Sequence, residues 1–116
     1  VVRLAGAPRT HAWDRLLADA GALIWQAGPL TKGASLCHGT AGSAMALLKL
    51  WRRTGDARWL DRARAMAMHA LGQARHSGLQ HGQGRHTLWT GDLGLAVFLW
   101  QCIHGRAGVP LLDIVE

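Results

Sequence analysis

Apolar side chains along this chain recur with the three- to four-residue spacing of helices, and no segment shows the sustained two-residue alternation of a strand. The first helical segment begins after Thr10, a good N-cap residue, and stops at Gly28-Pro29. Polar residues separate its apolar positions, so we expect an amphipathic helix. The apolar positions are Trp13, Leu16, Leu17, Ala20, Ile24 and Ala27.

The same spacing predicts three further helices. The segment 38–53 is apolar almost all round, which is typical of a helix that is buried on most sides. Residues 54–56 (Thr-Gly-Asp) break the chain and cap the next helix, whose apolar stripe spans residues 60–74. Residues 76–86 are rich in glycine and polar side chains, so we expect a loop there. The last helix spans about residues 91–103 and is again largely apolar.

Amphipathic and apolar helices therefore alternate in the order outer, inner, outer, inner. This order predicts an all-α fold with two layers, in which the helices that open near Gly39 and Gly91 pack side by side. Glycine at the start of each inner helix permits close approach of the backbones. Four helices would leave the inner pair uncovered on at least one side, so we expect further repeats, a partner chain or self-association.

One pattern of residues occurs twice, and a fixed internal period indicates a structural unit that is used more than once. Leu36, Gly39, Gly42, Ala44 and Leu47 return 52 residues later as Leu88, Gly91, Gly94, Ala96 and Leu99.

Only the first copy of this pattern carries potential metal ligands. It holds Cys37 and His38 where the second copy holds Trp89 and Thr90. A thiol and an imidazole are ligands of the kind that zinc prefers. This favours a metal-binding pair, and the alternative of a buried cysteine beside a capping histidine stays open.

Composition narrows the function classes. The 116 residues are 49% hydrophobic, enough for one domain or part of one. The net charge is +6, but the basic residues are scattered along the chain, are mixed with acidic residues and form no basic run. This distribution disfavours nucleic-acid binding. No segment approaches the roughly 20 apolar residues of a membrane span, and residues 1–8 lack a signal-peptide pattern.

The two cysteines lie at unrelated positions and do not form the pattern of a disulfide framework. We therefore expect both thiols to be reduced and the protein to be located in the cytoplasm.

Several short segments of the chain form a recognisable set, namely Gly28-Pro29-Leu30-Thr31-Lys32-Gly33, Leu36-Cys37-His38-Gly39-Thr40-Ala41-Gly42, Thr54-Gly55-Asp56, Arg62-Ala63 and Thr87-Leu88-Trp89-Thr90-Gly91-Asp92-Leu93-Gly94. Through these segments the chain resembles the lanthionine synthetase C-like family over about its whole length from Trp13 to Asp113. The resemblance implies an α/α toroid built from concentric helix hairpins. Residues 1–116 would then be the C-terminal portion of such a domain, an incomplete domain with about two outer/inner hairpins.

The resemblance also implies a chemistry. In this family zinc has three protein ligands, and two of them match Cys37 and His38; the third would be a cysteine outside this chain. The implied reaction adds a cysteine thiolate to dehydroalanine or dehydrobutyrine and forms a thioether. The substrate would be a peptide or a small thiol such as glutathione. Because the upstream ligand and acid-base residues lie outside it, we expect this chain alone to be inactive.

Two other function classes are alternatives to this enzyme. A non-catalytic helical module that binds a peptide or glutathione is the main alternative. A carbohydrate-active toroid would need paired carboxylates in a cleft, and the seven acidic residues lie mostly at helix caps and outer faces.

Four more residues are candidates for the site. Lys32 and Arg85 each lie shortly before one copy of the repeated pattern, where they could bind anionic groups of a substrate; the alternative is a solvated loop cation. His81 and His86 flank the glycine-rich segment and could exchange a proton near neutral pH; the alternative is a pair of loop histidines without a role.

The remaining notable residues fit structural roles. Trp89 is expected in packing, with a substrate cleft as the alternative, and Asp92 is expected to cap a helix start. Cys102 lies within an apolar helix and is expected as a small core residue. Cys37, at the start of a helix, should therefore be the more reactive thiol.

Overall fold

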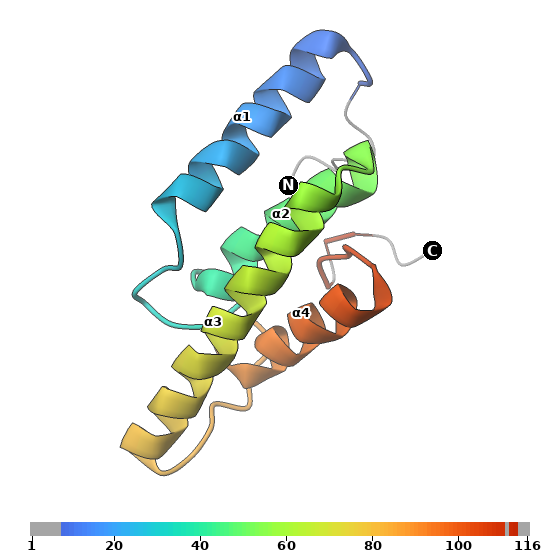
Figure 1. The fold of residues 1–116 in the computed structure, drawn as a ribbon. Coiled ribbons are helices and arrows are strands. Elements are labelled where there is room, and N and C mark those ends of the chain that lie inside the picture. The colour runs from blue at the N-terminus through green and yellow to red at the C-terminus, as the bar shows by residue number, and fades with distance from the viewer. Residues whose placement is uncertain (1–7, 111, 114–116) are drawn as a thin grey trace.

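The computed structural model describes residues 8–110 and 112–113, and this part of the chain contains four α-helices and no strand (Figure 1). The all-α prediction is therefore confirmed. The helices are α1 (His11–Ala27), α2 (Thr40–Thr54), α3 (Ala57–His81) and α4 (Asp92–His104).

Helix α2 is central to the packing and contacts each of the other three helices. Its Leu47 and Leu48 are among the largest fully buried side chains, and burial of one leucine stabilises a fold by about 1.5–3 kcal/mol. The prediction of a helix buried on most sides is confirmed. The buried residues of α2 are Thr40, Ala41, Ala44, Met45, Leu47, Leu48, Leu50 and Arg53.

Helix α1 begins and ends at the predicted residues. The Thr10 hydroxyl accepts a hydrogen bond from the Trp13 amide at 3.3 Å, and Gly28 ends the helix with a φ of 72°. Arg53 of α2 ties the start of α1 down, because its Nε donates to an Asp14 carboxylate oxygen at 2.8 Å. The local chemistry of the caps therefore sets both bounds.

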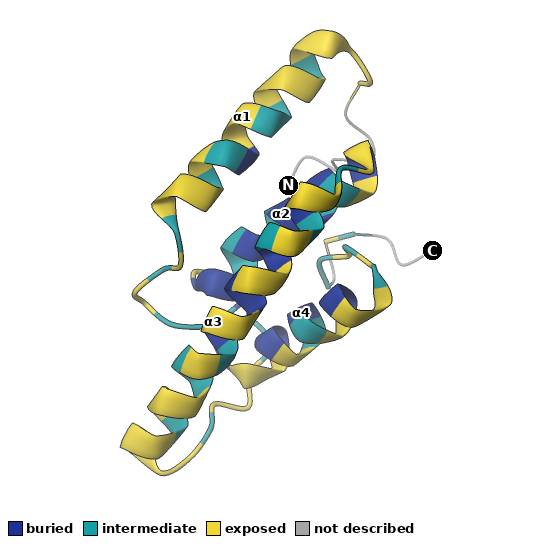
Figure 2. Cartoon of the chain, viewed as in Figure 1, coloured by how far each residue is buried: buried dark blue, intermediate teal, exposed yellow. Residues whose placement is uncertain are grey.

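Helix α1 is attached along a narrow strip. Its only buried residue is Gly21, where an added Cβ would lie 2.2 Å from Leu50 of α2 and 2.9 Å from Trp59 of α3. Most of its surface is exposed (Figure 2), including Leu16 at 57% and Leu23 at 67%. The apolar positions of the predicted amphipathic helix are therefore not all covered, because among the described residues only this strip packs against α2 and α3.

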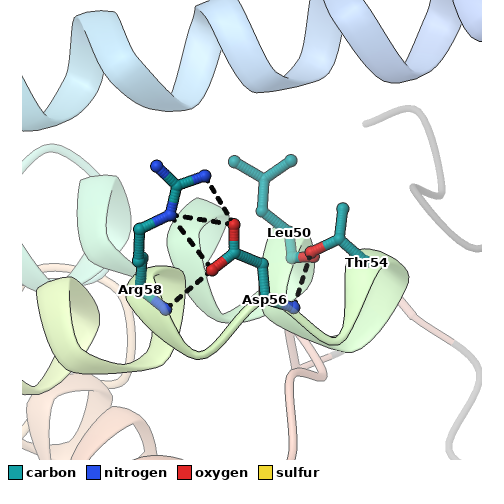
Figure 3. A network of polar contacts seen from close by, with 4 residues as sticks. All are labelled: Leu50, Thr54, Asp56 and Arg58. Atoms are coloured by element: carbon teal, nitrogen blue, oxygen red, sulfur yellow. Dashed lines mark hydrogen bonds and ion pairs between the residues drawn. The ribbon is translucent and has the colours of Figure 1, made fainter.

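A polar corner joins α2 to α3 (Figure 3). The Thr54 hydroxyl donates to the Leu50 carbonyl at 2.8 Å and accepts from the Asp56 amide at 3.2 Å. The Asp56 carboxylate accepts from the Arg58 amide at 3.0 Å and from the Arg58 guanidinium at 2.7–3.2 Å. The side-chain bonds from Arg58, followed by its amide bond, lower the pKa of Asp56 below its ordinary value. The predicted break and cap at residues 54–56 are confirmed.

Helix α3 is longer than predicted, so the expected loop over residues 76–86 is wrong for residues 76–81. The helix passes through Gly78 and ends at Gly82, whose φ of 69° lies in the left-handed region that glycine adopts at little cost. The apolar stripe ends near Ala74, which is why the sequence pattern predicts a helix end there. The last two turns carry mostly polar residues instead, and two of these, Ser77 and His81, line a pocket.

Helix α4 is covered on one side only. Leu95, Phe98 and Cys102 are buried, whereas the opposite face exposes Leu93 at 51%, Trp100 at 45% and Ile103 at 74%. This agrees with the expectation of an incompletely covered inner helix, and self-association through such a face stays a prediction. None of the described helices has the length and apolar character that a membrane crossing requires.

Candidate functional site

The two copies of the repeated pattern form turns with the same backbone connection. The Thr40 amide donates to the Gly33 carbonyl at 2.9 Å, and the Asp92 amide donates to the Arg85 carbonyl at 2.7 Å. Each bond reaches back seven residues, and both ends are shifted by the 52-residue period. Gly39 and Gly91 are the N-caps of α2 and α4, which are in contact. The prediction that these two helices pack side by side is confirmed.

The last glycine of each copy lies against its own turn. A Cβ at Gly42 would lie 2.1 Å from the Leu36 carbonyl oxygen, and one at Gly94 would lie 2.2 Å from the Leu88 carbonyl oxygen. Real Cβ atoms essentially never come within 3.0 Å of another atom in this way. The glycines of the pattern are therefore required by a close approach of backbone to helix.

A polar pocket of about 610 Å³ opens between the two turns and the C-terminal half of α3. Four of the predicted site residues line it, namely Lys32, His38, His81 and Arg85. They come from three segments, and in the sequence the outermost of them lie 53 residues apart. Cys37 and His86 are exposed but do not line the pocket. Trp89 does not line it either: its ring is half-buried and packs against the core, in agreement with the packing interpretation.

A partly buried hydrogen-bond network fixes one wall of the pocket. The Thr40 hydroxyl, which is fully buried, donates to Oε1 of Gln73 at 2.7 Å and accepts from the Leu30 amide at 3.1 Å. Nε2 of Gln73 donates to the Leu30 carbonyl at 2.7 Å. The turn before α2 is thereby tied to both α2 and α3.

A carboxylate fixes the opposite wall. Oδ2 of Asp92 accepts a hydrogen bond from the Arg85 amide at 2.9 Å, and the N-cap of α4 is Gly91 without a side-chain bond. The expectation that Asp92 caps the helix start is therefore wrong: its carboxylate closes the preceding turn instead. Asp92 is the one acidic residue that the described pocket lining contains.

Gln73 and Ser77 are pocket residues that the sequence analysis missed. Both lie on α3, and together with His81 they are spaced four residues apart on one face of the helix. The i, i+4, i+8 spacing of polar residues is the available signal. The glycines and polar side chains of residues 76–86, which predict a loop, mask it for Ser77 and His81.

The two cysteines lie in opposite environments. Cys37 is exposed, whereas Cys102 is 4% exposed in α4. Burial raises the pKa of the Cys102 thiol to about 11, against a smaller opposing effect of the Arg64 charge. A thiol with that pKa is almost entirely protonated at neutral pH and is a poor nucleophile or metal ligand.

The donor chemistry of Cys37 and His38 fits part of a zinc site. Both side chains are exposed and of the types that zinc binds. Among the described residues, no group of three or more histidine, cysteine or acidic side chains is placed to hold a metal ion. The pair would supply two ligands, and a catalytic zinc site takes three from the protein.

Comparison with known proteins assigns the chain to a family. The model of the family described as "Lanthionine synthetase C-like protein" matches residues 10–111. The chain is 36% identical over 95 residues to "Glutathione S-transferase LANCL1" of Danio rerio, and 37% identical over 62 residues to "LanC-like protein GCL1" of Arabidopsis thaliana.

These matches cover 81% and 53% of this chain, but 23% and 14% of the two relatives. The chain therefore spans about a quarter or less of the length of these curated relatives. No solved structure matches it. The match of the family model over nearly the whole chain shows that the chain belongs to the lanthionine synthetase C-like family.

Proposed function

We propose that the protein carrying this chain is a zinc-dependent enzyme that adds a thiol to a dehydroalanine or dehydrobutyrine residue and so forms a thioether. The observation that carries this proposal is the position of the Cys37–His38 pair, since His38 lines a polar pocket that also contains Lys32, His81 and Arg85. Family membership supports it. One relative is named a glutathione S-transferase, so we take glutathione or a peptide cysteine as the thiol.

Cys37 and His38 would hold the zinc together with at least one ligand from outside the described residues. When bound with an open position, zinc favours the thiolate form of an entering thiol near neutral pH. We place the reaction in the cytoplasm, where the free thiols of Cys37 and Cys102 would stay reduced.

Lys32 and Arg85 serve to bind the substrate. They approach the pocket from the turns before α2 and α4, respectively, and Asp92 is engaged by the Arg85 backbone. Two cations facing one carboxylate favour an anionic ligand, and a guanidinium binds a carboxylate through paired hydrogen bonds. Glutathione and peptide termini carry such carboxylates.

We assign the proton transfer to His81. In the addition, the thiol loses its proton, its sulfur bonds to the β-carbon, the carbon–carbon double bond is lost, and the α-carbon gains a proton. His81, in the last turn of α3, would supply that proton, because it lines the pocket and histidine is the commonest general acid in enzymes. His86 lies outside the pocket lining, so we assign the role to His81.

The test is to incubate the intact protein with glutathione and a dehydroalanine peptide and to detect the adduct by mass spectrometry. Cys37→Ala and His38→Ala should abolish adduct formation, whereas Cys102→Ala, which removes the buried thiol, should retain it. Lys32→Ala and Arg85→Ala should raise KM for glutathione, and Arg15→Ala, which removes an exposed charge on α1, should not. Adduct formation at the wild-type rate by Cys37→Ala would refute the proposal.

A non-catalytic binding module is the second candidate. It is favoured by one observation, namely that the described residues supply the cations of the pocket but only two zinc ligands. Such a module would bind glutathione with an affinity that depends on Lys32 and Arg85, would form no adduct, and would not change when Cys37 is replaced.

A further inference from the structure

The copy of the repeated pattern that carries no ligands lies directly against the copy that does. The Cys37 amide donates a hydrogen bond to the Trp89 carbonyl at 2.8 Å. Trp89 occupies the position of Cys37 in the second copy. The two equivalent positions are thus joined through the backbone, and this bond anchors an exposed turn residue to a distant part of the chain.

A second contact lies one residue earlier. Leu36 is buried at 6% exposure, and its Cβ would lie 2.8 Å from a Cβ added at Gly94. The first turn can approach this closely only because the second copy has glycine there. Cys37 is therefore flanked by two contacts to the second copy, one through its own amide and one through Leu36.

The second copy is itself held firmly. The Trp89 ring packs against the core, and Asp92 closes the turn through bonds between its amide and carboxylate and the Arg85 backbone. An acceptor fixed in this way can orient the group that donates to it.

We propose that the ligand-free copy positions Cys37, with the Trp89 carbonyl and the Gly94 backbone holding the Cys37–His38 turn in the conformation that presents both ligands. The inference rests on the proposed metal-binding role of this pair. It accounts for a repeat that keeps its glycines and leucines without its ligands: the second copy needs a backbone acceptor that an aromatic ring fixes on the core, and a small residue at position 94. Partners that orient metal ligands typically contribute about 10- to 100-fold to metal affinity.

The first test measures the zinc affinity of the intact protein by competition with a chromophoric chelator. Trp89→Ala and Gly94→Ala should bind zinc about 10- to 100-fold more weakly while still folded. Trp89→Phe, which keeps an aromatic ring on the core, should retain the wild-type affinity. Gly72→Ala is the matched control for Gly94→Ala, because it makes the same change in a helix with nothing within 4 Å.

The second test measures hydrogen exchange of the Cys37 amide by NMR in the zinc-free intact protein. The amide should be protected in the wild type and should exchange markedly faster in Trp89→Ala, because the carbonyl of residue 89 is retained but no longer held by a ring on the core. A merely structural role of Trp89 would lower the unfolding temperature and leave both this protection and the zinc affinity unchanged. If Gly94→Ala does not fold, hydrogen exchange of the Cys37 amide in the wild type and the zinc affinities of the Trp89 variants still test the positioning role.

Two results would overturn the positioning role: an unprotected Cys37 amide in the wild type, or wild-type zinc affinity in folded Trp89→Ala. The proposed function fails separately. If Cys37→Ala itself retains zinc, the metal site is wrong; if it loses zinc while Trp89→Ala retains it, only the positioning role is wrong.

Discussion

Alanine at the last glycine of each repeat copy tests the turn geometry. A new Cβ would lie 2.1 Å from the Leu36 carbonyl oxygen in Gly42→Ala and 2.2 Å from the Leu88 carbonyl oxygen in Gly94→Ala. In both variants the new Cβ would overlap a backbone oxygen, so rotation of a side chain cannot relieve the overlap. Each turn must move away from its helix.

The cost follows from comparison with Gly72→Ala. Alanine gains about 1 kcal/mol over glycine inside a helix, and this gain is common to all three variants. Forcing extra atoms into packed surroundings costs about 1–3 kcal/mol, and a backbone obstacle places both repeat variants in the upper half of that range. Gly42→Ala and Gly94→Ala should therefore each be about 2–3 kcal/mol less stable than Gly72→Ala.

Urea unfolding of the intact protein, followed by circular dichroism, measures these differences. Equal stability of Gly42→Ala, Gly94→Ala and Gly72→Ala would refute the close approach of turn to helix. A large cost in only one of the two repeat variants would refute the structural equivalence of the two copies.

Three further predictions concern stability. Thr40→Val should lower the free energy of unfolding by about 1–3 kcal/mol in chemical denaturation, because the Leu30 amide and Gln73 lose a buried partner; Thr40→Ser, which keeps the hydroxyl, should lose much less. Asp56→Ala should lower the unfolding temperature at neutral pH and have little effect well below pH 3.8, because a lowered pKa stabilises the fold above the ordinary value and the contribution is lost as pH falls; an equal effect at both pH values would contradict this. Burial raises the pKa of Cys102 from 9.0 to about 11, so the protonated thiol contributes stability that is complete below pH 9 and is lost as pH rises toward 11, by at most about 3 kcal/mol. Cys102→Ala should remove this part of the loss of stability at alkaline pH. An unchanged dependence of stability on pH would count against the burial of the thiol.

Most helix bounds were predictable because they depend on local chemistry. The Thr10 cap and the glycines at positions 28 and 55 act within a turn of the helices they delimit. The end of α3 was missed for the opposite reason. Gly78 and its polar neighbours look like a loop in sequence, and only the packing around the pocket shows what the last turns of that helix face.

The candidate site was predictable in its chemistry and unpredictable in its assembly. The 52-residue repeat and the residue types at Cys37 and His38 are visible in the sequence. That His81 lines the same pocket, and His86 does not, depends on how α3 crosses the two turns. The role of Gln73 was hidden because its partner Leu30 lies 43 residues away.

The central claim is that Cys37 and His38 hold zinc beside the pocket, and elemental analysis of the intact protein tests it most directly. Wild-type protein and Cys102→Ala should contain stoichiometric zinc after gel filtration, whereas Cys37→Ala should lose it and keep its helical circular-dichroism spectrum. Helicity should survive because the second copy folds with Trp89 in the same position. Equal zinc content in wild-type protein and Cys37→Ala would contradict the account.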